Sequence, residues 1–272
     1  MMNPVPDEAF VIRENVLVRY CRSCDEVSVP EGVTQIGDSA FLGCRGIRSI
    51  TLPEGLTEIG RHAFSDCTEL AQIRLPVSLR KIGGYAFSGC CRLENAKIPE
   101  GVTGIGGFAF YGCENLLGLQ LPEGVETIGA QAFFGCRKLT NIAIPSSVHR
   151  IGERAFFGCD GVVSFSVSSE NLFYRSEEGV LFDRCSRALV AFPHEKKGFY
   201  AVPGGTAEIA EYAFQDCDGL TDLLIPAGVK RIERGAFAGC CRLARIRMPG
   251  DIKVRPGAFY NCRAQIERSF PE

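Results

Sequence analysis

The sequence predicts a repeat solenoid, in which short parallel β-strands, turns and 3₁₀ segments, with little α-helix, stack as successive coils. The main evidence is an Ala-Phe dipeptide that recurs every 23 residues, with alanine at positions 40, 63, 86, 109, 132 and 155, and again at 213, 236 and 258. A cysteine follows each of these phenylalanines three residues later. Fixed periods of about 20 to 50 residues indicate stacked repeats, because no single unit can bury its own apolar side chains.

Residues 70–90 contain the elements expected in one coil. The run 73–75 alternates apolar and polar residues and ends at Pro76, which predicts a short strand that pairs with the next coil. A second extended piece over 79–82 ends at Gly83. The rest of the unit is too short for an α-helix, so we expect a turn or a single 3₁₀ turn there. Each coil therefore has three short sides.

Two positions of the repeat are expected to form columns inside the solenoid. Cysteine is a small apolar filler, and the parallel side chains of stacked coils disfavour the torsion angles of a disulfide, so we expect reduced thiols. The cysteine column would contain Cys44, Cys67, Cys90, Cys113, Cys136, Cys159, Cys217, Cys240 and Cys262. The phenylalanine column would contain Phe41, Phe64, Phe87, Phe110, Phe133, Phe156, Phe214, Phe237 and Phe259.

We expect a single solenoid over residues 1–272. The long step between the sixth and seventh Ala-Phe contains two apolar runs, 179–182 and 188–192, around a polar turn, which predicts an inserted hairpin. The first coil needs a cap, because it would otherwise expose an unpaired strand edge. The expected order is an N-terminal hairpin cap at 1–30, six regular coils at 31–159, a divergent coil with the hairpin insertion at 160–203, three further coils at 204–262 and a C-terminal tail at 263–272.

The repeat pattern also carries a family resemblance. It reads L-x-x-I-x-(L/I)-P-x-x-V-x-x-I-G-x-x-A-F-x-G-C, covers about residues 26–262 and resembles the BspA-like leucine-rich repeats of bacterial proteins. The resemblance implies a leucine-rich-repeat right-handed coil that opens with a hairpin. It also implies a non-enzymatic module, since BspA-like proteins are associated with attachment to host or matrix proteins and to other bacteria. An intracellular scaffold is the alternative function.

Composition and charge exclude several kinds of partner. The chain has 30 Lys and Arg against 32 Asp and Glu, so it lacks the basic excess that nucleic acid or a polybasic membrane patch requires. We find no secretory signal and no run near the ~18 apolar residues of a membrane helix, and expect no membrane insertion. Reduced cysteines favour the cytoplasm, whereas the resemblance favours the cell surface or secretion, and both stay open. We expect a monomer.

No group of residues has the pattern of a catalytic or metal site, and we expect no enzymatic activity, cofactor or metal. Cys21 and Cys24 form a lone C-x-x-C pair without the further ligands that zinc needs, which leaves a disulfide or free thiols as the main alternatives. Insertions in repeat proteins often carry function. A thiol-dependent or metal-dependent enzyme centred on residues 160–203 is therefore a remote alternative, with candidates Asp183, Cys185, His194 and Glu195.

The candidate binding surface comes from outward positions of the two strands. Stacked parallel strands place equivalent side chains of successive coils about 4.8 Å apart. Arg74, Lys97 and Gln120 are equivalent positions on the first strand, and Arg80 and Lys81 lie on the second. Together the basic residues form one modest basic region. The favoured interpretation is a solvated face that keeps the solenoid soluble, and docking of an acidic partner or a glycan is the alternative.

Aromatic residues near the Ala-Phe turn form a second candidate surface. Exposed rings at Phe108, Tyr111, Phe134 and Phe157 are expected to follow one another along the fourth to sixth coils. They either form a stripe that binds a ligand or cover the core from outside.

Overall fold

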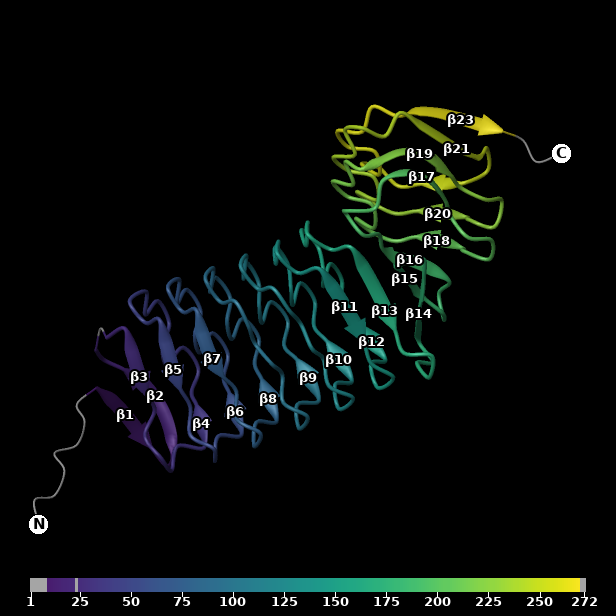
Figure 1. The fold of residues 1–272 in the computed structure, drawn as a ribbon. Helices are drawn as coiled ribbons and strands as arrows, with labels where there is room; N and C mark the ends of the chain where they lie inside the picture. The colour runs from purple at the N-terminus through teal and green to yellow at the C-terminus, as the bar shows by residue number, and fades with distance from the viewer. Residues whose placement is uncertain (1–8, 23, 270–272) are drawn as a thin grey trace, which may run out of the picture. The chain divides into compact units, whose positions relative to one another are not determined.

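The computed structural model describes residues 9–22 and 24–269, and contains 23 strands in these ranges. No helix is present in the described residues, and turns fill the segments between strands. The chain forms two compact units, Met1–Leu139 with Arg150–Gly158 and Thr140–His149 with Cys159–Glu272. In each unit, short strands from successive coils lie side by side as a β-solenoid (Figure 1). The predicted fold class is therefore confirmed.

An eight-stranded sheet runs through the first unit. It begins with an antiparallel hairpin, and β2 then pairs in parallel with the first of a series of two-residue strands. Partners in this series are 23 residues apart, as for Ile36, Ile59 and Ile82. The strands, in spatial order, are β1 (Phe10–Arg13), β2 (Val16–Tyr20), β4 (Gln35–Ile36), β6 (Glu58–Ile59), β8 (Lys81–Ile82), β9 (Gly104–Ile105), β10 (Thr127–Ile128) and β12 (Arg150–Ile151).

The other two sides of each coil are a second sheet and a ladder of turns. The second sheet contains β3 (Glu26–Ser28), β5 (Ser49–Thr51) and β7 (Gln72–Arg74), and isolated bridges extend it through Asn95 to Gly118. The turns hydrogen-bond from coil to coil, as where the Phe64 N–H donates to the Ala86 carbonyl at 2.8 Å. Each side of the coil thus forms backbone hydrogen bonds with a neighbouring coil.

The second unit contains the inserted hairpin. In one sheet β14, β15 and β16 are antiparallel neighbours, and β16 then pairs in parallel with β18. The C-terminal strand β23 extends another sheet by pairing with β21, so the expected tail contains a strand. The strands are β11 (Asn141–Ile144), β13 (Ser164–Val167), β14 (Tyr174–Glu177), β15 (Val180–Asp183), β16 (Ala188–Ala191), β17 (Gly198–Ala201), β18 (Glu208–Ile209), β19 (Leu220–Leu224), β20 (Arg231–Ile232), β21 (Arg245–Pro249), β22 (Lys253–Val254) and β23 (Gln265–Ser269).

The core of each unit contains a column of stacked phenylalanine rings. In the first unit, ring centroids from Phe41 to Phe133 follow one another at 5.0 to 5.4 Å, and Tyr20 of the cap adds a ring 5.1 Å before Phe41. In the second unit, Phe192 of the insertion lies 4.7 Å from Phe214. The Phe column is continued at both points by aromatic residues that lie outside the regular repeat.

The repeat cysteines lie beside these rings as free thiols. Seven of the nine are buried, whereas Cys44 and Cys262 are half-buried. Thiols also donate to the carbonyl of the Phe in the preceding coil, as from Cys90 to Phe64 at 3.1 Å. Burial raises the pKa of the Cys67 thiol to about 12, so this side chain is neutral at physiological pH. The cysteine therefore adds a polar link between coils within an apolar column.

Candidate functional site

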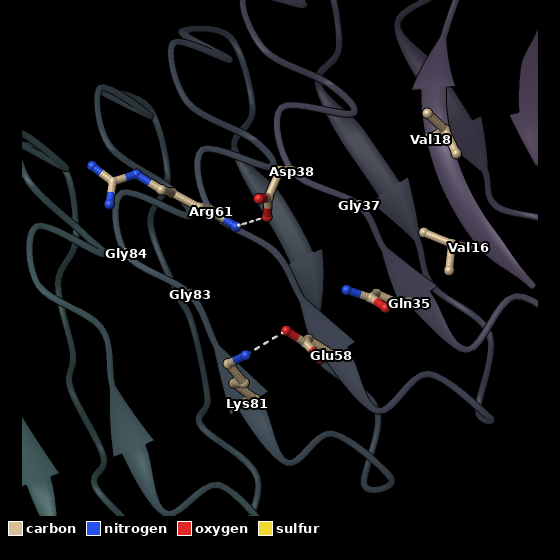
Figure 2. Close-up of a pocket in the computed structure, with 10 residues that line it drawn as sticks. All are labelled: Val16, Val18, Gln35, Gly37, Asp38, Glu58, Arg61, Lys81, Gly83 and Gly84. Atoms are coloured by element: carbon tan, nitrogen blue, oxygen red, sulfur yellow. Dashed lines mark hydrogen bonds and ion pairs between the residues drawn. The ribbon is translucent and has the colours of Figure 1, made fainter.

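A groove of about 630 Å³ crosses the outer face of the eight-stranded sheet in the first unit (Figure 2). Valine side chains from β2 line one side, and charged side chains of the following coils line the other. The groove is open and is lined by both polar and apolar groups, unlike the enclosed apolar cavities that bind most small molecules. The residues that line it are Val16, Val18, Gln35, Gly37, Asp38, Glu58, Arg61, Lys81, Gly83 and Gly84.

Glycines form the floor of this groove because the coils approach closely there. A glycine follows the isoleucine of each two-residue strand in the first unit, and a Cβ at Gly83 would lie 2.7 Å from the Gly60 carbonyl carbon. At Gly106 the corresponding Cβ would lie 2.5 Å from the Gly83 carbonyl carbon. Real Cβ atoms do not approach a backbone atom this closely, so each coil requires glycine. In this floor Gly37 is buried, and Gly83 and Gly84 are half-buried.

The charged side chains of the groove form an alternating pattern. Lys81 Nζ lies 2.6 Å from Glu58 Oε1, and this carboxylate raises the pKa of Lys81. The backbone N–H of Arg61 donates to Asp38 Oδ1 at 2.7 Å. The Arg61 guanidinium carbon lies 5.1 Å from the centroid of the Tyr85 ring. The groove thus offers both signs of charge beside the two valines, which suits a ligand with mixed polar and apolar groups.

The structure divides the predicted basic region between two sheets. Lys81 lines the groove, whereas exposed Arg80 donates to the carbonyls of Val77 and Leu79 in its own turn at 2.9 and 3.0 Å. Arg74 belongs to β7 in the other sheet and lies 3.7 Å from Glu54, with both side chains largely exposed. Lys97 and Gln120 are exposed in the next two coils, in line with Arg74. Only Lys81 is therefore in the groove.

Sequence reasoning missed most of the groove. It compared outward pairs on the strands but not the position directly after the repeat glycine, which holds Asp38, Arg61, Gly84 and Gly107 in successive coils. An alignment of the coils at that position would have shown two charged residues followed by two glycines. The contribution of Val16 and Val18 could not be read from the repeat, because they belong to the cap.

The aromatic residues near the Ala-Phe turns of the first unit form two stacks of rings, which meet where the tilted rings of Phe108 and Tyr111 lie 5.8 Å apart. Phe108, Tyr111, Phe134 and Phe157 are half-buried rather than exposed. His62 and Tyr85 extend the series, with centroids 4.5 Å apart from His62 to Tyr85 and from Tyr85 to Phe108. Because the ring faces stack on one another, mainly ring edges remain for a ligand. This geometry favours the interpretation that the rings cover the core.

The candidate catalytic residues of the insertion lie in different surroundings. Cys185 is exposed in the turn between β15 and β16, where Asp183 Oδ1 accepts a hydrogen bond from the Ser186 N–H at 2.7 Å. His194 lines a groove of about 700 Å³ that also contains Glu195 and Asp160, and neither Cys185 nor Asp183 lines it. His194 Nδ1 lies 3.8 Å from Asp160 Oδ1, and burial lowers the pKa of His194.

The C-x-x-C pair is the remaining candidate for metal binding. Cys21 and Cys24 are exposed thiols, and burial together with a hydrogen bond to Cys24 raises the pKa of Tyr20 to about 12. Within residues 9–22 and 24–269, no group of three or more His, Cys, Asp or Glu is arranged to hold a metal ion.

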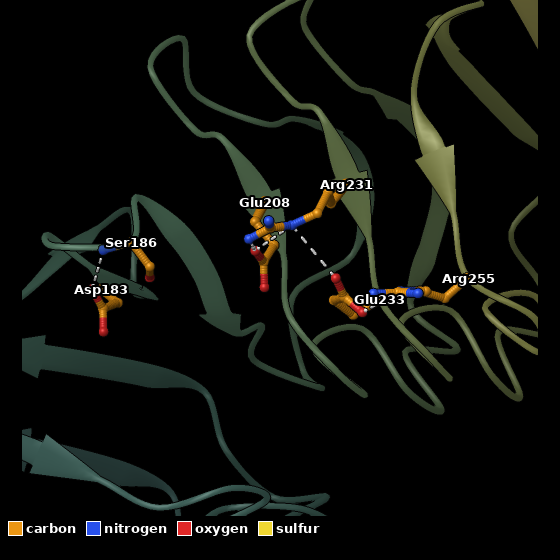
Figure 3. A network of polar contacts seen from close by, with 6 residues as sticks. All are labelled: Asp183, Ser186, Glu208, Arg231, Glu233 and Arg255. Carbon is orange, nitrogen blue, oxygen red and sulfur yellow. Dashed lines mark hydrogen bonds and ion pairs between the residues drawn. The ribbon is translucent and has the colours of Figure 1, made fainter.

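A network of ion pairs joins neighbouring coils of the second unit (Figure 3). Arg231 contacts Glu208, and its Nε lies 3.6 Å from Glu233 Oε1. Arg255 Nε lies 3.3 Å from Glu233 Oε2. The opposite charges compensate one another, and pairs with exposed arginines contribute little to stability. The network therefore marks coil contacts rather than a charged binding surface.

Comparisons with known proteins identify the family. A profile described as "BspA type Leucine rich repeat region (6 copies)" matches residues 11–118, 103–196 and 196–272. The chain belongs to the BspA-type leucine-rich repeat family. Its 23-residue coils, their glycine floor and their Phe and Cys columns are the form that this repeat takes here. No match was found among curated proteins.

Solved structures of bacterial leucine-rich repeat proteins share the fold of this chain. A leucine rich cell surface protein from Faecalibacterium prausnitzii A2-165 is 25% identical, with a TM-score of 0.73 and coverage of 97% of this chain and 94% of that chain. The pneumococcal vaccine antigen PcpA is 22% identical, with a TM-score of 0.76 and coverage of 92% and 71%. A leucine-rich repeat protein from Bacteroides ovatus ATCC 8483 is 24% identical, with a TM-score of 0.60 and coverage of 96% and 78%.

Among the residues that the structure describes, no helix has the length and apolar character needed to cross a bilayer.

Proposed function

We propose that this BspA-type protein is a non-enzymatic interaction module that binds an extended protein or glycan surface, as in bacterial adhesion. The groove of the first unit is the observation that carries the proposal. It crosses four strands, is open to solvent, and combines Val16 and Val18 with the charges of Asp38, Arg61 and the Glu58–Lys81 pair. An open surface that combines polar and apolar groups fits a macromolecule better than a small substrate.

The basic row on the other sheet is a second part of the proposed surface. Arg74, Lys97 and Gln120 are exposed in successive coils, and Arg80 and Lys81 follow on the adjoining side. Lys97 is without an ion pair in the described part of the chain. These side chains would contact acidic groups of a protein or glycan at the rim of the interface, where charges mainly affect the association rate.

We place the protein at the cell surface in this proposal, as a monomer without a nucleic-acid partner. Similarity to a Faecalibacterium prausnitzii protein described as a cell surface protein supports this location. An intracellular scaffold is the second candidate, and the free thiols favour it, because reducing compartments keep cysteines unpaired. An enzyme centred on the insertion is the third candidate and requires that Cys185→Ala abolishes a measurable turnover.

Location is tested by protease treatment of intact source cells. Peptides of this chain would be identified by mass spectrometry, with a cytosolic protein as the lysis control. We expect release of peptides without the cytosolic marker. Retention of the chain inside intact cells would reject adhesion and favour the scaffold.

The groove is tested by binding of the full chain to arrays of matrix proteins and glycans. The charge-reversed variants Arg61→Glu and Lys81→Glu are expected to lose at least tenfold in affinity for the partner, about 1.4 kcal/mol. Lys138→Glu makes the same charge change on an exposed turn outside the groove and is the matched control. Equal binding by all three variants would reject the groove, and the double variant Arg74→Glu with Lys97→Glu would then test the basic row.

A further inference from the structure

The loop between β13 and β14 presents two large apolar side chains to solvent. Leu172 is 78% exposed and the adjacent Phe173 is 39% exposed. Isolated exposed leucines are common on protein surfaces. What distinguishes this pair is the way in which the loop is fixed, because a rigid apolar tip loses little conformational entropy when it binds.

A buried asparagine fixes the loop from below. Asn171 is 1% exposed, and its Nδ2 donates to the carbonyls of Pro145 and Val148 at 2.7 and 2.9 Å. Its Oδ1 accepts hydrogen bonds from the backbone N–H groups of Phe173 and Tyr174 at 2.9 and 2.7 Å. The amide therefore uses two donors and two acceptor positions, which is its full capacity.

Arg184 fixes the same loop from the β15 side. Its backbone N–H donates to the Phe173 carbonyl at 2.7 Å, and its Nε donates to the Tyr174 carbonyl at 2.8 Å. Arg184 forms no ion pair within the described residues, so its charge is available at the edge of the tip. His149 lies on another edge, with its ring centroid 5.7 Å from that of Phe173. Glu170 is the one acidic residue among residues 168–174, and its carboxylate accepts a hydrogen bond from the Ser169 hydroxyl.

We propose that this tip, residues 171–174 with Arg184, inserts into an apolar pocket on a partner protein whose rim carries carboxylates. Leu172 and Phe173 would fill the pocket, and the Arg184 guanidinium would pair with a rim carboxylate. Few, well-ordered anchors of this kind dominate the binding energy of protein interfaces. This inference rests on the proposed interaction function and names the site and the partner chemistry, but it does not involve the groove of the first unit.

Site-specific photocrosslinking of the full chain tests the proposal. A diazirine-bearing amino acid replaces Leu172 in one preparation and Val77, an equally exposed side chain of the first unit, in the other. Both preparations are applied to intact source cells and to their lysate, and the crosslinked protein is identified, purified and titrated. We expect one protein to crosslink at 172 and not at 77, through a peptide that contains Asp or Glu.

Affinity measurements with that purified protein decide the outcome. We expect Leu172→Ser and Phe173→Ser each to weaken binding at least tenfold, Arg184→Gln to weaken it several-fold, and Val77→Ser to leave it unchanged. Leu172 is exposed, so Leu172→Ser should retain the native urea-unfolding midpoint. If the protein binds wild type and Leu172→Ser equally, the tip is rejected while the interaction function stands. If no protein crosslinks at either position and none binds on the arrays, both proposals fail.

Discussion

In the first unit, a glycine follows the isoleucine of each two-residue strand, and its lack of a side chain allows neighbouring coils to approach closely. In the first unit the position holds Gly37, Gly60, Gly83, Gly106, Gly129 and Gly152. From Gly60 to Gly152, a Cβ at this position would come within 2.9 Å of a backbone atom of the preceding coil. None of the six has a positive φ. Close approach, rather than backbone torsion, therefore requires glycine.

Replacing one of these glycines is expected to destabilise the first unit. In Gly106→Ala the new methyl group would lie 2.5 Å from the Gly83 carbonyl carbon, which must move. Overpacking of this kind costs about 1 to 3 kcal/mol. Gly55→Ala is the matched control, because nothing lies within 4 Å of its Cβ position. Urea unfolding should show a lower midpoint for Gly106→Ala alone, and equal midpoints would contradict the close-approach argument.

Because of the buried thiols, the free energy of unfolding is expected to fall as the pH becomes alkaline. Burial raises the pKa of Cys67 to about 12, whereas an unfolded thiol titrates near 8.5. At intermediate pH the folded state retains a proton that the unfolded state has lost, so the free energy of unfolding falls as pH rises from about 8.5 toward the folded-state value.

This dependence is tested by urea unfolding at about pH 7 and about pH 10, on either side of the unfolded pKa. The loss of stability between the two values should be smaller for Cys67→Ala than for the wild type. Cys185→Ala removes an exposed thiol and should leave the difference unchanged. If Cys67→Ala lost as much stability between the two pH values as the wild type, the pH dependence would come from other groups.

The strand and turn elements of each coil follow from short sequence signals. Pro76 ends the expected strand near 73–75, and β7 spans Gln72–Arg74. The second extended piece contains the two-residue strand β8, in which Lys81 and Ile82 pair with neighbouring coils. The short elements have little stability of their own. They depend on packing between coils, which the Phe column provides.

The stacked Phe column is the interaction whose loss should cost most. Phe110 is fully buried, with ring centroids 5.2 Å from Phe87 and 5.4 Å from Phe133. Phe110→Ala should lower the free energy of unfolding by about 3 to 5 kcal/mol, because it opens a cavity between two rings. Phe259→Ala should cost less, because Phe259 is half-buried and stacks on Phe237 at 5.2 Å. Comparable losses in urea unfolding would contradict a column that weakens at its end.

The second unit departs from the glycine rule of the first. At the position after the isoleucine or valine it has Ala210, Glu233 and Arg255. Side chains therefore fit between these coils, and two of them, Glu233 and Arg255, form an ion pair. The same repeat thus produces a glycine-floored groove in one unit and a charged network in the other.

The distribution of thiols over the whole molecule gives a direct test of both units. Cys21, Cys24, Cys185 and Cys241 are exposed, and seven repeat cysteines are buried. Brief iodoacetamide labelling of native protein should modify the four exposed thiols first, and denaturant should expose the rest. Peptide mass spectrometry identifies the modified positions. Rapid native labelling of Cys90 or Cys113 would contradict the buried column.

The arrangement of the full chain as one solenoid with the predicted divisions stays a prediction. Each of the two units is compact by itself, and the boundary between them in the sequence falls near the expected insertion. The 23-residue register within each unit supports the predicted period. The register does not test the division into cap, coils, insertion and tail, which stays a proposal.

The sequence by itself determined the period, the family, the coil shape and the residues of the two interior columns. It could do so because a fixed repeat places the same side chain at the same point of every coil. Only the tertiary structure decided which outward residues share a surface. It separated Arg74 from Lys81, joined the cap valines to Arg61, and placed buried Asn171 beneath exposed Leu172. The contacts of the cap valines and of Asn171 depend on the cap and the insertion, where the period does not apply and the distances between residues are set by packing.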